Sequence, residues 1–383
     1  MLYDFDQVIE RRGTDSVKWK KYGEGVLPLW VADMDFVSAE PIIQALHRRV
    51  DHGFFGYPSP SEELYRVIQE RLQKLYQWEI QANEIIFIPS LVTGLNICFQ
   101  AYADLGDHIL TQTPVYHHFI KDPVAHGRVI VAPPLTRQGD SYGVDFAAFE
   151  NKITPRTRVF VFCNPHNPVG RVYTRKELES MAEICLRHNL IICSDEIHCD
   201  LLYPGYRHIP IATLSPEVAK RTVTLMAPSK TYNLAGINCG LAIIPNAELQ
   251  RIWKEISLGI VPGVNIMGYV AAWAGFRDGQ EWLDQVLDYL NGNREILCRV
   301  MIDRLPGMRM TRMEATYLAW LDCREAGIPG NPFEFFLKEA RVALNDGREF
   351  GKGGEGFVRL NFACPRKTLL EAVERMSSAL QKL

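Results

Sequence analysis

The sequence contains no block of basic residues, and its 42 Lys and Arg residues are offset by 45 Asp and Glu residues, which leaves a net charge of -3. Such a chain carries no electrostatic signature for nucleic acid or an anionic membrane. It also has no apolar run approaching the roughly 20 residues of a membrane span. Its first residues, MLYDFDQVIERRG, lack the apolar core of a signal peptide. We therefore expect a cytoplasmic protein that binds small molecules, not nucleic acid or membranes.

The cysteines form no pattern that predicts disulfides or a metal site. There are nine of them, an odd number, and no two make a C-x-x-C pair. A disulfide framework or a zinc site would need paired or closely spaced cysteines. We therefore expect reduced thiols, many of them packed as small hydrophobic side chains, and no bound metal.

The central part of the chain alternates short β-rich runs with helical patterns, such as those at 93–103 and 176–188. Several runs are continuously apolar, which is typical of buried strands in a mostly parallel sheet. The alternation predicts an α/β domain built in layers. The expected strands are 85–88, 108–111, 128–132, 158–163, 190–194, 222–226 and 238–244.

The two chain ends differ from the centre, and 383 residues suggest about two domains. We expect a small α+β domain from residues 1–45 and 280–383, and a large domain from residues 46–279. The small domain should contain helices at 281–305, 332–340 and from 367, with strands at 316–322 and 357–362. The glycine-rich stretch 347–356 should form a mobile loop.

Residues that could bind a ligand or take part in catalysis follow four of the expected strands. Lys230 comes soon after one strand, and a lysine amine can condense with an aldehyde once burial makes it nucleophilic. Asp195 ends another strand, where a carboxylate can hold a protonated pyridine nitrogen. Asn167 follows a third strand in NPHNPVG, and Ser90 opens a helix whose free N–H groups suit a phosphate.

Each of these features has a plainer explanation when it is taken alone. Lys230 could be a solvated loop lysine, and Asp195 with Glu196 could cap a helix. The Asn-Pro dipeptides could simply start turns, and every helix start carries free N–H groups. A chance occurrence of all four residue types at strand ends in this order is much less expected than a chance occurrence of any one of them. Strand ends in open α/β sheets are also where ligands bind.

Together the motifs make the chain resemble fold-type I pyridoxal 5′-phosphate (PLP) enzymes of the aspartate aminotransferase superfamily. The shared pattern is N-P-x-N-P-x-G, then D-E-x-[HY], then S-K-T-[FY]-N, and it covers essentially the whole chain. Finer matches resemble the MalY/PatB-type C–S lyases, or cystathionine β-lyases. These are PLWVADMDF, SDEIHCDL, APSKTYNLAG and VRLNFACPR. The resemblance implies a three-layer large domain with a mostly parallel sheet and a small α+β domain.

The resemblance implies roles for the residues around the cofactor ring. Lys230 would form the Schiff base with PLP and move the proton at the substrate Cα. Asp195 would pair with the ring nitrogen. Asn167 would bond the ring hydroxyl, with His198 near the same oxygen. Tyr116, in TPVYHHF, would stack on the ring, although it could instead be a core tyrosine.

The phosphate would lie on the backbone of Leu91 and Val92, with help from the hydroxyl of Ser90 or Ser229. Tyr57, in GFFGYPSP, resembles the tyrosine that reaches the phosphate of a neighbouring subunit. The expected assembly is therefore a homodimer with shared active sites. The plainer explanation of Tyr57 is an aromatic residue in a turn.

Arg359 resembles the arginine that binds the α-carboxylate of the substrate, a task that suits the planar guanidinium. A surface arginine on a strand is the alternative. Trp30 and Asp33 would belong to a segment that closes over the site, with Trp30 at the substrate or simply packed. Asn238 stands where many aminotransferases have a phosphate-binding arginine, and the C–S lyase branch lacks that arginine too.

The expected reaction is PLP-dependent α,β-elimination from L-cystathionine or a related cysteine S-conjugate, which gives a thiol, pyruvate and ammonia. A class I/II aminotransferase is the alternative, because both reactions begin by removing the Cα proton. A regulatory or binding protein that retains the fold is a third reading. The intact set of Asn167, Asp195, Lys230 and Arg359 argues against it.

Overall fold

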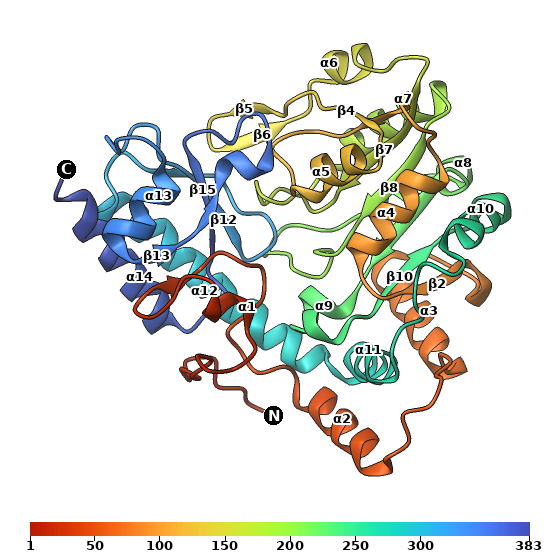
Figure 1. Cartoon of the computed structure of the whole chain (residues 1–383), viewed down its shortest axis with the longest axis horizontal. Coiled ribbons are helices and arrows are strands. Elements are labelled where there is room, and N and C mark those ends of the chain that lie inside the picture. Colours follow the sequence, from red (N-terminus) through yellow and green to blue (C-terminus); the bar gives the residue numbers. More distant parts are fainter.

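The computed structural model describes residues 1–383, and a seven-stranded sheet lies at the centre of its larger part (Figure 1). The strand order is β2-β10-β9-β8-β7-β3-β4. β10 runs antiparallel to both neighbours, and the other pairs are parallel. The strands are β2 (Ile85–Ile88), β3 (His108–Leu110), β4 (Val129–Val131), β7 (Thr157–Cys163), β8 (Ile191–Asp195), β9 (Thr222–Met226) and β10 (Gly240–Ile243).

All seven expected strands form, so the prediction of a mostly parallel α/β sheet is confirmed. Their ends differ from the predicted ones by up to two residues. The C-terminal ends of β7, β8 and β9 lie side by side, with Cys163 opposite Asp195 and Asp195 opposite Leu225. This register brings the segments that follow these strands to one edge of the sheet.

Helices cover both faces of the sheet, as the apolar character of β7 requires. Val159 and Val161 pack into a cluster with α4 and α10, whereas Phe160 and Phe162 pack into a cluster with α6 and α7. Successive strand residues point to opposite faces, so both faces are buried. These helices are α4 (Leu91–Ala101), α6 (Phe146–Asn151), α7 (Arg175–Arg187) and α10 (Ala247–Ser257). The expected three-layer arrangement is confirmed.

The remaining elements of the larger part are short or lie beside the sheet. α11 packs on α2 and α3, below the sheet in Figure 1. The remaining helices and strands of the larger part are α2 (Glu40–His52), α3 (Glu62–Tyr76), α5 (His118–Ala125), β5 (Thr136–Gln138), β6 (Ser141–Gly143), α8 (Pro216–Ala219), α9 (Pro228–Thr231) and α11 (Ile266–Asp278).

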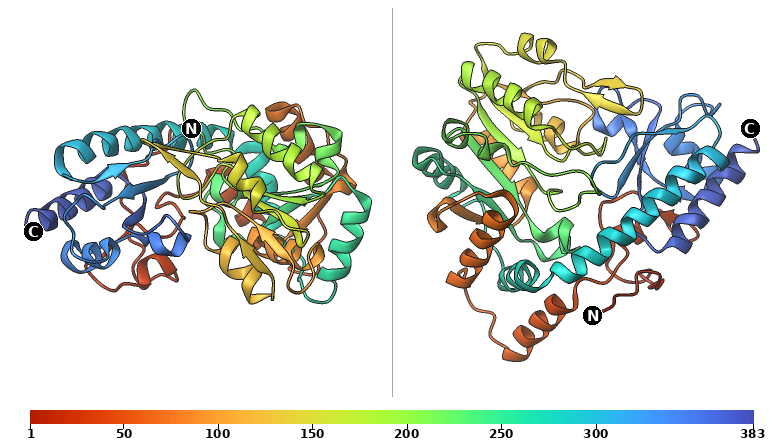
Figure 2. Two further views of the ribbon diagram at one scale, coloured as in Figure 1. Left: turned by 90° about the horizontal axis from the view of Figure 1, so that it is seen from above. Right: turned by 180° about the vertical axis from the view of Figure 1, so that it is seen from behind.

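A second, antiparallel sheet in the order β11-β12-β15-β14 forms from the C-terminal part of the chain (Figure 2). Two long helices pack beside it, α12 (Gln280–Arg304) and α14 (Arg366–Leu380). The N-terminal segment joins this part through β1 (Leu27–Pro28), which pairs with β13 (Val342–Ala343). The other elements are α1 (Val17–Lys20), β11 (Arg309–Met310), β12 (Leu318–Asp322), α13 (Pro332–Phe335), β14 (Asn345–Asp346) and β15 (Phe357–Asn361).

The expected helices and strands of the C-terminal part are present, and the 332–340 helix continues past α13 as a wider turn over Phe336–Ala340. The division at residues 45/46 and 279/280 stays a prediction. No helix is both long enough and apolar enough to span a membrane.

The glycine-rich stretch 347–356 was expected to be a mobile loop, and that description is wrong for its start. Gly347–Phe350 forms a short 3₁₀ helix, and Phe350 is buried. The backbones of Gly347 and Gly354 approach so closely that a Cβ on Gly354 would lie 1.9 Å from the Gly347 carbonyl oxygen. Glycine is needed at these two positions because no Cβ fits between the backbones.

Candidate active site

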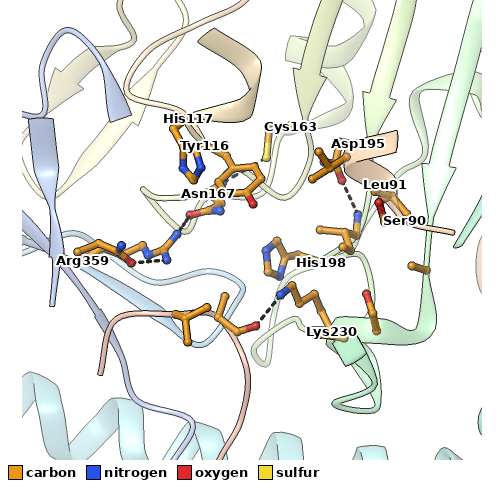
Figure 3. A pocket seen from close by; sticks show the side chains of 18 of the residues that line it. Ser90, Leu91, Tyr116, His117, Cys163, Asn167, Asp195, His198, Lys230 and Arg359 are labelled. Atoms are coloured by element: carbon orange, nitrogen blue, oxygen red, sulfur yellow. Dashed lines mark hydrogen bonds between the residues drawn. The ribbon is translucent and has the colours of Figure 1, made fainter. Parts of the chain in front are cut away.

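A cavity of about 300 Å³ lies where the strand ends of the central sheet face the C-terminal sheet (Figure 3). The expected residues of all four strand ends line it, together with Arg359 from β15 and Trp30 from the N-terminal segment. Two segments at opposite ends of the chain therefore close a site that is built on the central sheet. The predicted residues in its lining are Trp30, Leu91, Val92, Tyr116, Asn167, Asp195, His198, Ser229, Lys230 and Arg359.

Lys230 stands in the one-turn helix α9, directly after β9. Its Nζ donates a hydrogen bond to the carbonyl oxygen of Ala32 at 2.5 Å. Burial lowers the pKa of Lys230 to about 8. The Arg359 cation also lowers this pKa, whereas the Asp33 and Asp195 carboxylates raise it. About a tenth of such an amine is uncharged at pH 7, far more than of an ordinary lysine, so it can act as nucleophile or base.

Asp195 is the last residue of β8 and is buried. Its Oδ1 accepts a hydrogen bond from the Ile197 N–H at 3.1 Å. Burial raises the pKa of Asp195 to about 7, and the neighbouring Glu196 carboxylate adds to the rise. A carboxylate in this position is stabilised by a cation placed beside it, which a protonated pyridine nitrogen would supply.

Arg359 lies in the middle of β15 with its guanidinium buried. It donates to Asn167 Oδ1 at 2.9 Å, to the Trp30 carbonyl oxygen at 3.0 Å and to Asn345 Oδ1 at 2.5 Å. All three acceptors are neutral, and its Nε has no partner. Burial lowers the pKa of Arg359 to about 10. A buried arginine without a carboxylate partner is suited to binding the carboxylate of a ligand.

The start of α4 carries free N–H groups at the place where the sequence predicted an anion site. Ser90 caps this helix through its Oγ, which accepts from Thr93 N–H at 3.1 Å. The N–H groups of Leu91 and Val92 precede the first helical bond, from Gly94 to the Ser90 carbonyl oxygen. Free N–H groups and the helix dipole favour an anion there.

Ser229 and Asn238 also line the cavity, and neither carries a charge. An anion held at this place would therefore depend on backbone and hydroxyl donors, as the missing arginine led us to expect.

Tyr116 and His198 flank the middle of the cavity (Figure 3). Burial raises the pKa of Tyr116 to about 12, so the phenol stays neutral. Burial lowers the pKa of His198 to about 3, with Lys230 and Arg359 adding to the effect, so this imidazole is also neutral. The Nδ1 of His198 is buried without a hydrogen-bond partner in the chain. Such a group is a contact point for a polar ligand atom.

Tyr57 does not line this cavity. It is fully exposed on the surface, where it borders a shallow hollow with Phe55, Pro58 and Met267. This position leaves the expected contact between subunits untested. Trp30 lies in the lining, and its Nε1 donates to the Lys18 carbonyl oxygen at 3.2 Å.

The structure adds lining residues that the sequence did not single out, among them His117, Asn345 and Phe350. His117 could have been found from its place next to Tyr116. Asn345 lies in β14, opposite Arg359 of β15, and Phe350 ends the short 3₁₀ helix that follows β14. No local pattern marks either residue. Phe350 supports the Arg359 guanidinium, which lies 5.0 Å from its ring centre.

The residues that line the cavity have the chemistry that PLP requires. The cavity offers an amine for the aldehyde, a buried carboxylate for the ring nitrogen and helix N–H groups for the phosphate. The unpartnered Nδ1 of His198 adds a polar contact that the chain itself does not satisfy. The structure shows no group of three or more His, Cys, Asp or Glu that could bind a metal.

Comparisons with known proteins agree with this geometry. Residues 25–376 match the family model "Aminotransferase class I and II". Cystathionine beta-lyase PatB of Bacillus subtilis is 39% identical over 386 residues, which cover 98% of this chain and all of PatB. The crystal structure of OvoB is 44% identical with a TM-score of 0.95, and each chain covers 100% of the other.

A third relative, cystalysin from Treponema denticola, contains PLP in its crystal structure. It is 31% identical, with a TM-score of 0.96 and full coverage of both chains. The resemblance to the PatB branch that the motifs predicted is thus confirmed. The chain belongs to the aminotransferase class I and II family.

Proposed function

We propose that this protein is a PLP-dependent lyase that cleaves the Cβ–S bond of L-cystathionine or related cysteine S-conjugates. The proposal rests on one observation: Lys230, Asp195 and Arg359 line the same cavity, and the Arg359 guanidinium has no carboxylate partner. The relatives named cystathionine beta-lyase and C-S lyase support the choice of reaction.

PLP, when bound, would supply an electron-withdrawing ring that stabilises negative charge at the substrate Cα. Arg359 would bind the α-carboxylate bidentately and so fix the orientation of the Cα–H bond. Lys230, with its lowered pKa, would take the Cα proton. Asp195 would keep a positive charge on the ring nitrogen through its buried carboxylate.

Loss of the Cα proton allows the sulfur to leave from Cβ as a thiolate, which takes up a proton. With cystathionine, the balanced reaction consumes one water and gives homocysteine, pyruvate and ammonia. Arg359 and Lys230 act on the cysteine half of the substrate, which all the S-conjugates share. The remainder of the substrate would therefore be selected by other lining residues, such as Trp30, His117 and Phe350.

A substrate panel tests the proposal. Purified holoenzyme is given cystathionine, cystine, cysteine and S-alkylcysteines, and pyruvate is measured for each. At least one sulfur substrate should release pyruvate and thiol in equal amounts, while serine and alanine should not release pyruvate. Failure of every sulfur substrate would refute the lyase assignment.

We also propose a homodimer in which Tyr57 reaches the phosphate site of the neighbouring subunit. Tyr57, Phe54 and Phe55 are exposed together on one loop, which is costly for a monomer in water. The test mixes and refolds two variants, Tyr57→Ala and Lys230→Ala. If the sites are shared, one of the two sites in the heterodimer combines the intact Lys230 of one subunit with the intact Tyr57 of the other and is restored. Partial recovery of activity supports the dimer, and no recovery with full heterodimer formation contradicts it.

A cytoplasmic location completes the proposal. All nine cysteines are free, and eight of them are buried, as is usual for proteins of a reducing compartment. Fractionation of the source cells with an antibody to the chain tests this assignment. Recovery in the soluble cytoplasmic fraction is expected.

A further inference from the structure

The segment that closes one side of the cavity, residues 30–36, belongs to no helix or strand, and we call it the wall segment. Its first three residues line the cavity. Backbone groups outside regular structure need other hydrogen-bond partners. Side chains from distant parts of the chain supply them, and two of these, Lys230 and Arg359, have roles in the proposed chemistry.

Asn233 also binds the wall segment, although it has no part in the chemistry described so far. Its Oδ1 accepts from the Met34 N–H at 2.9 Å. Its Nδ2 donates to the carbonyl oxygens of Met34 at 3.1 Å and Phe36 at 2.9 Å. These partners also fix which amide atom is oxygen and which is nitrogen, since an N–H can only donate and a carbonyl oxygen can only accept. One neutral side chain therefore holds three backbone groups of the segment.

Asn233 stands three residues after Lys230, so it joins the wall segment to the turn that carries the lysine. Its φ is 58°, in the left-handed region that asparagine and glycine tolerate better than other residues. Its own carbonyl oxygen accepts from Ser38 Oγ at 3.2 Å. Four hydrogen bonds thus connect this one residue with residues 34–38.

The wall segment is bound to β15 as well. Asn361 donates to the carbonyl oxygens of Val31 and Asp33, each at 2.7 Å. Arg359 donates to that of Trp30 at 3.0 Å, which is one of the three acceptors that orient its buried guanidinium. The position of the wall segment therefore affects the position of this guanidinium.

We propose that Asn233 is a positioning residue, which holds the wall segment on the Lys230 turn and through it orients Arg359 for the substrate carboxylate. The inference rests on the proposed function and deepens it. Asn233 lies outside the cavity lining, so its hydrogen bonds do not compete with a ligand. The Lys230 and Arg359 bonds do compete, because the same nitrogens are needed for the cofactor aldehyde and the substrate carboxylate. Asn233 can therefore keep the segment in place while those two bonds are exchanged.

The test compares Asn233→Gly with the wild type. Glycine adopts the same left-handed backbone without strain, so the variant removes the amide alone. Asn189 has the same φ of 58° on an exposed turn, and Asn189→Gly is therefore the matched control. Thermal melting checks that both variants are folded.

Hydrogen–deuterium exchange measures the wall segment directly in the PLP-loaded protein. Loss of three hydrogen bonds should speed the exchange of residues 30–36 by about tenfold.

The dissociation constant of L-alanine, read from the PLP absorbance, measures carboxylate binding without a leaving group at Cβ. It should rise about tenfold in Asn233→Gly, because the Arg359 guanidinium is held less firmly. The affinity for PLP should change little, since the residues expected to hold it lie on other elements. Asn189→Gly should leave all three measurements unchanged.

Unchanged exchange in folded Asn233→Gly would show that this residue does not hold the segment. Faster exchange with an unchanged L-alanine constant would show a purely structural role. Either result overturns the proposal, as does an equal loss of affinity for PLP and for L-alanine.

If Asn233→Gly does not fold, the wild type decides. Its Met34 amide should stay protected when PLP and L-alanine are bound, and exchange at the rate of an unstructured amide would overturn the proposal. None of these measurements requires cleavage of a sulfur substrate, so failure of the proposed reaction is distinguishable from failure of this inference.

Discussion

The Nζ of Lys230 donates a hydrogen bond to the carbonyl oxygen of Ala32, which lies 198 residues earlier in the chain. Tyr317 donates to the same carbonyl oxygen at 3.0 Å, and Arg359 donates to that of Trp30. The two residues with the most direct roles in the proposed chemistry thus also hold the N-terminal segment over the cavity. Their substitution should change both the chemistry and the closure of the site.

Removal of the Lys230 amine should abolish covalent cofactor attachment. We expect Lys230→Ala to lack the absorbance band at about 420 nm that is typical of lysine-bound PLP. Its rate of pyruvate release should fall by about 10³-fold or more, because nucleophile and base are lost together. The exposed Lys152→Ala provides a matched control and should keep both properties. A Lys230→Ala protein that retains the band would show that another residue anchors the cofactor.

The lowered pKa of Lys230 predicts how cofactor-free protein captures PLP. The uncharged amine is the nucleophile, so the rate of capture should rise with pH and level off above its pKa. Stopped-flow absorbance should give a midpoint near pH 8, whereas an ordinary lysine would give one near 10.5. A rate that keeps increasing through pH 10 would contradict the role of burial at this residue.

The raised pKa of Asp195 predicts a pH-dependent stability of the cofactor-free protein. The folded value is about 7, whereas an unfolded aspartate has a pKa of about 3.9. The protonated carboxyl therefore contributes stability below about pH 4, and this contribution is lost as pH rises through 7. Asp195→Asn should melt at a higher temperature than wild type above pH 7 and lose that advantage toward pH 4. Equal pH profiles would refute the raised pKa.

Arg359 should control substrate binding more than cofactor binding. Arg359→Lys keeps a positive charge but loses the bidentate geometry, so we expect KM for the amino acid to rise about 10- to 100-fold. The affinity for PLP should change little. The exposed Arg309→Lys, on the edge strand β11 of the same sheet, serves as control and should leave KM unchanged. A normal KM in Arg359→Lys would mean that the carboxylate binds elsewhere.

The sequence predicted correctly that Lys230, Asp195 and Asn167 meet in one cavity, because each lies at or just after the end of a buried strand; their roles toward a cofactor stay predictions. Lys230, Asp195 and Asn167 each stand within a few residues of a continuous apolar run, so the local pattern marks them. The order of the motifs then identified the family. The strand ends themselves shifted slightly, without moving any of these residues out of the site.

The sequence could not predict contacts that depend on packing between distant segments. Asn345 reaches Arg359 from the paired strand β14, and Phe350 does so from the 3₁₀ helix that follows it; nothing near them in the chain marks that contact. The hydrogen bond of 2.6 Å between His208 and Glu196 likewise joins residues that only the folded chain brings together. The glycines at 347–356 were misread because close backbone packing and mobility favour the same residue type.

The most direct test of the central claim is the fate of L-cystathionine when no keto acid is present. Purified holoenzyme should convert it to pyruvate, ammonia and a free thiol in equal amounts over many turnovers. An aminotransferase would need a keto-acid partner and would stop after a single half-reaction. Absence of pyruvate and thiol, combined with amino transfer once 2-oxoglutarate is added, would contradict the account.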